Sequence, residues 1–417
     1  MRSFLPLIRA EWPLLLFGFG MLFCSSFGQT FFIGLFSGAI REDLGLSHGE
    51  FGAIYSAATL ASAVLLVWSG ALIDRLDLRL FTCLVALGLA LGCALLAGSQ
   101  GALTLLIAIF MLRHMGQGLL GLTGPTATMR YVATDRGKAN AIVGMGFSFS
   151  EALLPTLAIA LLGLVGWRQS WLLWGAVALL LAPAICLWAL RGHSARHSAY
   201  LQGLDDSHAA AANSRQRQWT RNEVIRDPQL YLFLPALIAQ PMLFTGFIFH
   251  QVKLVEDKHW DLGLWAQLFV FYAAVNVVCK LFAGLIVDRF GAVRSVPLVC
   301  LPLGAGLLLL ACSDSFLVAW GFMGLMAVSV GAYSTLSSPF YSEMYGTLHL
   351  GAIKSFTAAT MVFATAVAPL VMGWLIDRGM SMDAMAVGAA VYVVIASALA
   401  RLGARRRFAA TATTPAG

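Results

Sequence analysis

Two stretches of the chain are near copies of each other: GALIDRLDLR at residues 70–79 and GLIVDRFGAVR at residues 284–294. Each ends a long apolar run, and the two copies are 214 residues apart. The same separation relates two further pairs near the ends of later apolar runs, Pro125 with Pro339 and Tyr131 with Tyr345. A constant separation over several apolar runs indicates an internal repeat, so the two halves of the chain are expected to fold alike.

The composition indicates that lipid surrounds most of the chain. Of the 417 residues, 59% are hydrophobic and only 11% are charged, whereas soluble domains carry about 25% charged residues. The apolar runs are continuous and long, without the alternation of barrel strands, which favours helices over sheets. Because a helical span needs roughly 20 apolar residues, the sequence predicts an all-α integral membrane protein with about twelve transmembrane helices.

One long polar segment, residues 191–228, divides these spans into six and six. The repeat then predicts two pseudo-symmetric six-helix bundles, residues 1–190 and 229–402, related by an axis along the membrane normal. Residues 191–228 would be a cytoplasmic linker and residues 403–417 a basic cytoplasmic tail. The expected spans are residues 12–38, 50–74, 80–98, 102–129, 140–165, 168–190, 229–253, 262–288, 294–312, 315–341, 351–376 and 381–402.

The distribution of Lys and Arg predicts the orientation. With both termini on one side, that side carries 20 of the 27 basic residues, and basic loops face the cytoplasm. This bias also explains the net charge of +7, so we expect no nucleic-acid partner. The apolar run near the N-terminus is long enough for a retained span, and the loops are very short. We therefore expect a multi-pass protein of the inner (plasma) membrane with both termini cytoplasmic.

The two repeated loops resemble the most specific motif of the major facilitator superfamily, and the resemblance covers nearly the whole chain. Membership implies a secondary transporter, acting as a monomer, with a latch between the bundles at the cytoplasmic side. Such bonds can break as the bundles rock; the alternative is a simple topology signal. Asp77 departs from the family pattern, because a glycine is usual there. The residues that would form the latch are Gly70, Asp74, Arg75, Arg79, Gly284, Asp288, Arg289 and Arg294.

The eighth expected span resembles that of the monocarboxylate transporters and oxalate–formate antiporters. Those proteins carry a cationic residue there, preceded four residues earlier by a polar or acidic one. The matching residues are Asn276 and Lys280, although Lys replaces the more common Arg and Asn stands where an acid often sits. By this resemblance, both residues would bind the substrate.

Three ionisable residues lie deep within expected spans, and each is a candidate functional residue because a charge there costs ~2.5–3.5 kcal/mol. The first, Lys280, lies about 12 Å inside the cytoplasmic end of its span at 1.5 Å per residue. It shares one helix face with Asn276 and Gly284. An ammonium on such a face could bind a carboxylate substrate, or it could instead extend to the interface.

The second, Glu151, lies within Gly144–Pro155 in the fifth span, where small residues allow helices to approach closely. In superfamily members the fifth and eighth spans meet, so we expect either an ion pair with Lys280 or a protonatable carboxylate that couples transport to protons. A static polar tie within the first bundle is the alternative.

The third, Arg113, lies four residues before Gln117 in a stretch that resembles the superfamily's arginine motif of the fourth span. The resemblance implies that Arg113 takes part in proton coupling or binds the anion, since a guanidinium offers several donors and stays charged. The alternative is a structural tie to backbone carbonyls or to Glu151. We also expect Gln29 and Tyr333 to line the substrate path.

The sequence favours a secondary active transporter of a small organic anion, a monocarboxylate by resemblance, coupled to protons. The alternatives are a proton-driven exporter of drugs or other small hydrophobic solutes, against which Lys280 argues, and a non-transporting membrane sensor. The chain carries no P-loop, metal motif or nucleophile elbow, so we expect no cofactor, no metal and no enzymatic activity. The expected partners are a small-molecule substrate, protons and the lipid bilayer.

Overall fold

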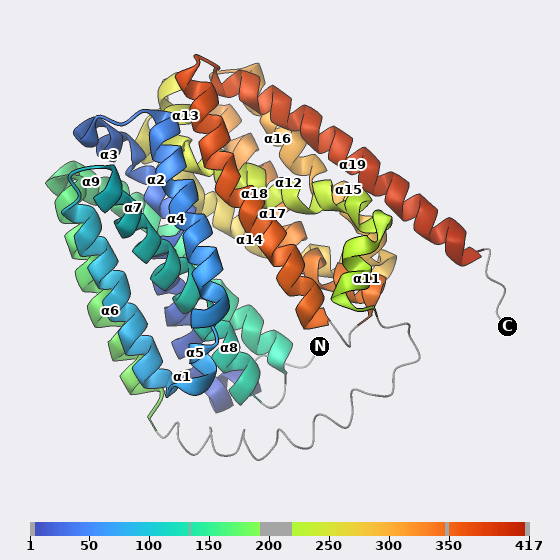
Figure 1. The fold of residues 1–417 in the computed structure, drawn as a ribbon, viewed down its shortest axis with the longest axis horizontal. Coiled ribbons are helices and arrows are strands. Elements are labelled where there is room, and N and C mark those ends of the chain that lie inside the picture. Colours follow the sequence, from blue (N-terminus) through green and yellow to red (C-terminus); the bar gives the residue numbers. More distant parts are fainter. Residues whose placement is uncertain (1–4, 133–134, 192–218, 347–349, 413–417) are drawn as a thin grey trace. The chain divides into compact units, whose positions relative to one another are not determined.

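The computed structural model describes residues 5–132, 135–191, 219–346 and 350–412, and nearly all of them are helical (Figure 1). The chain divides into two compact units, Met1–Ala210 and Ala211–Gly417. Eleven helices within the described ranges are long and apolar enough to cross a membrane. One of these, with 54 residues, is long enough to cross it twice. The predicted all-α membrane fold is confirmed.

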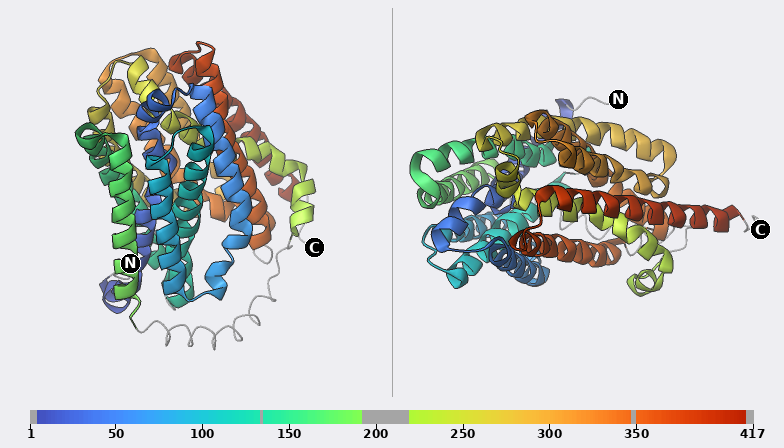
Figure 2. Two further views of the ribbon diagram at one scale, coloured as in Figure 1. Left: turned by 60° about the vertical axis from the view of Figure 1, so that its left-hand side comes forward. Right: turned by 90° about the horizontal axis from the view of Figure 1, so that it is seen from above.

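The first unit contains the repeat's first copy, and its helices run alongside one another in both views of Figure 2. Short breaks separate the helices wherever glycine, polar or capping residues interrupt the apolar runs. The elements are α1 (Leu5–Ser25), a 3₁₀ turn η1 (Ser26–Gly28), α2 (Thr30–Leu35), α3 (Ser37–Leu44), α4 (His48–Ser69), α5 (Leu72–Arg75), α6 (Leu78–Ala97), α7 (Ala102–Met111), a π-helix η2 (Leu112–Leu120), α8 (Gly121–Tyr131) and α9 (Arg136–Ala189).

Helix α9 contains two of the predicted spans. Gly166 lies inside it with φ 78° and ψ 173°, a backbone conformation that glycine adopts without a steric cost. The predicted spans 140–165 and 168–190 lie on either side of this residue. The 54-residue helix is therefore two spans that meet at a sharp turn of the chain around Gly166.

The second unit contains the other six predicted spans. Polar caps begin several helices, as at Asp261, whose carboxylate accepts a hydrogen bond from Leu264 N at 2.7 Å. The elements are α11 (Arg221–Arg226), α12 (Pro228–Phe249), α13 (Gln251–Asp257), α14 (Leu262–Phe290), α15 (Ala292–Val299), α16 (Leu301–Cys312), α17 (Phe316–Tyr345), α18 (Leu350–Asp377) and α19 (Met382–Ala412). Residues 192–218 of the predicted linker and 413–417 of the predicted tail lie outside the described residues.

The two copies of the repeated loop turn by different means. In the second copy, Gly291 adopts φ 83° and ends α14. At the equivalent place Asp77 has φ −56°, and its carboxylate caps α6 by accepting bonds from Arg79 N at 2.9 Å and Leu80 N at 3.3 Å. A side-chain cap thus replaces the left-handed glycine, which explains how the first copy tolerates its departure from the family pattern.

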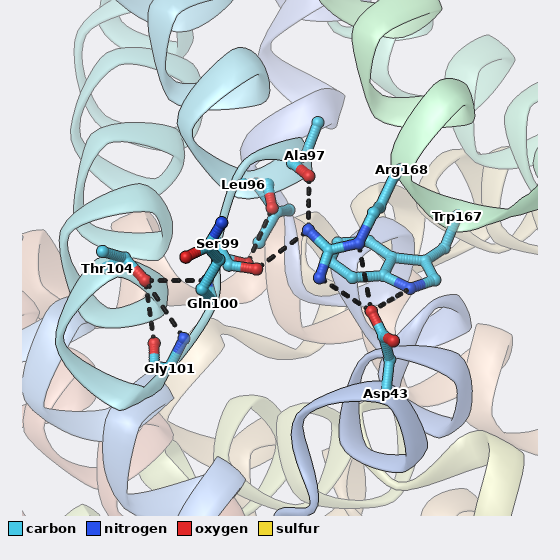
Figure 3. A network of polar contacts seen from close by, with 9 residues as sticks. All are labelled: Asp43, Leu96, Ala97, Ser99, Gln100, Gly101, Thr104, Trp167 and Arg168. Carbon is cyan, nitrogen blue, oxygen red and sulfur yellow. Dashed lines mark hydrogen bonds and ion pairs between the residues drawn. The ribbon is translucent and has the colours of Figure 1, made fainter.

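A cation holds the loop ends of the first unit together (Figure 3). Arg168 forms an ion pair with Asp43 at 2.8 Å and donates to the carbonyl oxygens of Ala97 at 2.6 Å and Ser99 at 2.8 Å. Trp167 donates to the same carboxylate at 3.2 Å. One guanidinium therefore joins α3, the α6–α7 loop and the middle of α9.

Lys258 performs the same task in the second unit. Its side chain is only 1% exposed and lies 2.8 Å from both Asp314 and Asp383. It also donates to the carbonyl oxygen of Ser313 at 3.2 Å. The ammonium joins the α13–α14 loop, the α16–α17 loop and the start of α19, and two carboxylates compensate for its burial.

The two cation clamps occupy equivalent places in the repeat. Ser313, whose carbonyl binds Lys258, stands 214 residues after Ser99, whose carbonyl binds Arg168. The cation and a carboxylate partner have exchanged places between the units. In the first unit the cation, Arg168, lies at the start of the sixth span, and its partner Asp43 lies after the first span. The second unit has its cation in the loop after the seventh span. The repeat has kept the clamp while changing the residues that form it.

The Lys258 clamp predicts a pH-dependent stability. Burial lowers the pKa of Lys258, but its hydrogen bonds to Asp314 and Asp383 outweigh this effect and raise that pKa. The hydrogen bond from Lys258 lowers the pKa of Asp314. Asp314 therefore contributes stability above its unfolded-state pKa, and this contribution is lost as the pH falls through its folded-state pKa. Between about pH 5 and pH 3, the thermal unfolding midpoint of the wild type should fall more steeply than that of Asp314→Asn.

The control for this prediction is the Lys258→Met background. Without the ammonium, Asp314→Asn should leave the slope of the unfolding midpoint against pH unchanged, because the carboxylate has lost its partner. Equal slopes for wild type and Asp314→Asn would contradict the assigned pairing.

Candidate functional site

The first predicted span is interrupted in its middle. Helix α1 ends at Ser25, residues 26–28 form a 3₁₀ turn, and Gln29 is extended with φ −86° and ψ 153° before α2 begins. A break inside a span leaves peptide groups without intrahelical partners, and in lipid these groups must be satisfied by the protein itself. Discontinuous spans of this kind commonly form the binding sites of transporters.

The break lies directly against the fourth span. A Cβ atom added to Gly28 would overlap the carbonyl oxygen of Leu112 and would lie 2.7 Å from the amide nitrogen of Gln117. One added to Gly116 would lie 2.9 Å from the backbone of Gly28. The two glycines permit a backbone-to-backbone crossing that larger residues would obstruct.

The fourth span is a π-helix where it meets the break. Residues 112–120 form η2, which includes Arg113 and Gln117. In an α-helix, residues four apart in sequence lie on the same face. In the wider π-helical turn, the side chains of Arg113 and Gln117 are rotated away from that common face. This departure could not be predicted from the apolar pattern, because π-helices arise from packing and are rare.

Arg113 supplies the donors that the break needs. Its side chain is buried, with 3% exposed, and it donates to the carbonyl oxygen of Gly28 at 3.1 Å and to Thr30 Oγ1 at 3.5 Å. Thr30 is in turn hydrogen-bonded to the Tyr55 hydroxyl at 2.6 Å, and the guanidinium lies 5.1 Å from the centre of the Tyr55 ring. The guanidinium therefore ties η1, α2 and α4 together from the fourth span.

The fifth span reaches the other side of the break through a serine pair. Ser150 Oγ lies 2.5 Å from Ser26 Oγ, and Glu151, the next residue, is buried with 2% exposed. Glu151 belongs to the first unit and Lys280 to the second. The ion pair expected between them therefore stays a prediction.

A glycine of the fifth span provides its close approach to α1. A Cβ added to Gly146 would overlap the carbonyl oxygen of Phe19 and would lie 2.9 Å from its carbonyl carbon. Gly146 lies within the stretch Gly144–Pro155, whose small residues are expected from the sequence to allow close helix approach. A Cβ added to Gly144 would have no neighbouring atom within 4 Å in the described part of the chain.

In the second unit, the polar residues expected on α14 are close to α17. Asn276 is buried with 1% exposed, and its amide nitrogen lies 3.5 Å from the hydroxyl of Tyr272, one helical turn back. Its side-chain oxygen has no hydrogen-bond partner among the described residues. Lys280 is half-buried one turn further along, and Thr335 donates to its carbonyl oxygen at 3.4 Å.

A glycine of α17 allows this close approach. A Cβ added to Gly331 would lie 2.9 Å from the carbonyl oxygen of Asn276 and 3.3 Å from the amide nitrogen of Lys280. Tyr333, two residues later, is half-buried, and its hydroxyl lies 3.5 Å from Met361 Sδ on α18. Asn276 and Lys280 thus lie where α14 crosses α17, and Tyr333 of α17 contacts α18.

The residues expected to form the latch have varied surroundings. Arg79 donates to the carbonyl oxygen of Leu190, at the end of α9 in its own unit. Asp288 and Arg289 are exposed, with the guanidinium of Arg289 5.4 Å from the Phe290 ring. Gly70 ends α4 in a helical conformation and Gly284 is half-buried on α14. The side chains of Asp74 and Arg75 lie outside the described residues.

Glu343 is a loop partner that sequence reasoning missed. Its carboxylate accepts bonds from Ala292 N at 2.7 Å and Val293 N at 3.4 Å, the first amides of α15. Glu343 lies near the end of α17, two residues before Tyr345, which is itself one of the residues related by the 214-residue repeat. A carboxylate at a helix N-terminus satisfies donors that the helix leaves unpaired.

Comparison with known proteins finds a family of membrane transporters and individual transporters that are similar to this chain. The family described as "Major Facilitator Superfamily" matches residues 18–369. A probable sulfoacetate transporter of Cupriavidus necator, SauU, is 25% identical over 368 residues, covering 82% of each protein. Among solved structures, a bacterial homologue of the human lysosomal transporter Spinster aligns with a TM-score of 0.70 and 14% identity, over 96% of this chain and 98% of that one. The nucleoside transporter NupG aligns with a TM-score of 0.68 and 14% identity, over 97% and 99%.

The crossing at Gly28 predicts a sharp sensitivity to volume. Gly28→Ala should lower the free energy of unfolding by about 1–3 kcal/mol, because the new methyl group overlaps two backbone atoms of η2. Gly121→Ala is the matched control in the same span, since its Cβ would meet no described atom within 4 Å. Thermal unfolding midpoints of the purified protein in detergent measure both effects. Equal midpoints for the two variants would show that the crossing is looser than described.

Proposed function

The chain belongs to the Major Facilitator Superfamily, and we propose that it is a secondary transporter that moves a small organic anion by alternating access. The name of the relative from Cupriavidus necator, a probable sulfoacetate transporter, supports an anionic substrate. The resemblance of Asn276 and Lys280 to the monocarboxylate transporters and oxalate–formate antiporters supports a carboxylate. A carboxylate-bearing anion of a few carbon atoms satisfies both.

The single observation that carries this proposal is the place of Lys280. Its half-buried ammonium lies within a span, one helical turn from the buried amide of Asn276. A cation within a span is costly, and such residues commonly mark the path of a substrate or an ion. An ammonium together with an amide suits a carboxylate, because the cation balances its charge and the amide can donate a hydrogen bond.

We assign Arg113 a positioning role toward the substrate path. Its guanidinium is bonded to the carbonyl oxygen of Gly28 and to Thr30, so it fixes the shape of the break next to Gln29. Gln29 is half-buried and extended, which suits a residue that contacts substrate. Tyr333 in the second unit is half-buried as well, and we propose that it also contacts the substrate.

We propose Glu151 as the proton-coupling residue. Glu151 is buried, and it follows Ser150, whose hydroxyl joins the fifth span to the break. A buried carboxylate changes protonation when its solvation or neighbouring charge changes, as alternating access requires. We further propose that the repeated loops latch the two bundles, and that the protein acts as a monomer in the inner (plasma) membrane.

Transport by reconstituted protein tests the substrate assignment. Proteoliposomes would be offered radiolabelled monocarboxylates and sulfoacetate, with and without an inward proton gradient. At least one acid should accumulate, and Lys280→Ala should reduce its initial uptake more than about tenfold, because a charge partner of the anion is lost. Lys354→Ala, which removes an exposed lysine at the start of α18, should transport like the wild type.

The same assay separates coupling from binding. Glu151→Gln should retain exchange of the acid at equilibrium but lose its dependence on the proton gradient, since the amide cannot be protonated in this pH range. Normal gradient-driven uptake by Glu151→Gln would disprove the proton role. If no acid moves, or if Lys280→Ala transports normally, the anion proposal is wrong while family membership stands.

The proposed orientation can be measured with cysteine labelling. Cys312 at the end of α16 is the exposed cysteine of the chain, and the others are buried or half-buried. With cytoplasmic termini, a membrane-impermeant maleimide should label Cys312 in intact cells. Arg406→Cys in a Cys312→Ser background should be labelled only after the cells are permeabilised. The opposite pattern would reverse the orientation.

A further inference from the structure

The second unit contains a basic pocket that lies apart from the residues proposed to bind substrate and protons. Its volume is about 540 Å³, and it lies between α15 and α19, whose labels are adjacent in Figure 1. In the part of the chain that the structure describes, its lining contains three arginines and no acid. The lining residues are Arg294, Pro297, Leu298, Arg401, Ala404 and Arg405.

The repeat explains why the arginines gather there. In the first unit, Arg79 of the repeated loop binds the carbonyl of Leu190, where α9 ends. The position equivalent to Leu190 is Ala404, but α19 continues past it to Ala412. The second loop has Val293 at the position equivalent to Arg79, and its arginine is the next residue, Arg294. Arg294 therefore lies beside the continuing helix α19, on the side that carries Arg401 and Arg405.

Three guanidinium groups around one cavity favour the binding of an anion. Arg401 and Arg405 are four residues apart on one helix, a spacing at which like charges repel. A bound anion offsets this repulsion. Guanidinium groups present paired N–H donors that match the oxygens of a phosphate group and bind it in a bidentate manner.

The depth of the pocket indicates where that phosphate comes from. Arg401 follows Met382, the first residue of α19, by about 19 residues, which is ~28 Å at 1.5 Å per residue. This length matches the hydrocarbon thickness of a bilayer. Leu298 and Leu402, beside the arginines, are 62% and 41% exposed, as expected for side chains in contact with acyl chains.

We propose that this pocket binds the phosphate group of an anionic phospholipid. The arginines hold the headgroup, and the exposed leucines contact the acyl chains below it. Basic pockets between membrane helices on the cytoplasmic side are suited to such headgroups. The pocket lies on the side of the second unit that we expect to face the cytoplasm, independently of which solute the protein transports.

Lipid titration of the full-length protein in a neutral detergent tests this inference. Phosphatidylglycerol should raise the thermal unfolding midpoint, and phosphatidylcholine at the same concentration should not. Arg401→Gln/Arg405→Gln should weaken the apparent affinity for phosphatidylglycerol by at least about twentyfold, since each arginine near the surface contributes roughly fivefold. The control Arg406→Gln removes an exposed arginine of the same helix that does not line the pocket, and it should behave like the wild type.

Arg294→Gln provides an independent variant on α15 if the double variant is unstable without lipid, and it should lose about fivefold in affinity. Inorganic phosphate forms the second arm of the experiment. Stabilisation by phosphate alone, equal to that by phosphatidylglycerol, would overturn the lipid assignment in favour of a soluble anion. An equal response of Arg406→Gln and the pocket variants would overturn the site itself.

Discussion

A peptide group in hydrocarbon must find its hydrogen-bond partner inside the protein, and this constraint governs the first unit. Most of the chain meets it with continuous helices. The first span does not, because it is interrupted at residues 26–29. The hydrogen bond from Arg113 to the carbonyl oxygen of Gly28 therefore stabilises the break from within. The contacts around it, from Tyr55 and Thr30 to the Ser26–Ser150 pair, are arranged about that interruption.

The constraint extends to the membrane surface, where helices end and carbonyl groups again need donors. The protein uses buried or half-buried cations there. Arg168 binds the carbonyls of Ala97 and Ser99, Lys258 binds that of Ser313, and Arg79 binds that of Leu190. These cations hold the ends of the spans together within each unit.

The two halves share the positions of their structural features more closely than the residues that form them. The clamp at the loop ends exists in both units, but its cation and anion occupy exchanged elements. The loop after the second span turns with a capped Asp77, and the loop after the eighth turns with Gly291. Where one copy ends a helix and the other extends it, the loop arginine meets the side of the helix instead of its end, and the basic pocket of α15 and α19 results.

The sequence by itself determined the all-α membrane fold and pointed to the family, because apolar length and the 214-residue repeat are properties of the linear chain. It also identified Arg113, Glu151, Asn276 and Lys280 as polar or charged residues within the spans, and therefore as candidate functional residues. Only the tertiary structure decided that the first span is broken and that the fourth is a π-helix against it. It alone showed that Gly146 makes the close crossing with α1. These features depend on contacts between backbone atoms of segments that are far apart in the sequence. The local periodicity of apolar residues cannot predict such contacts.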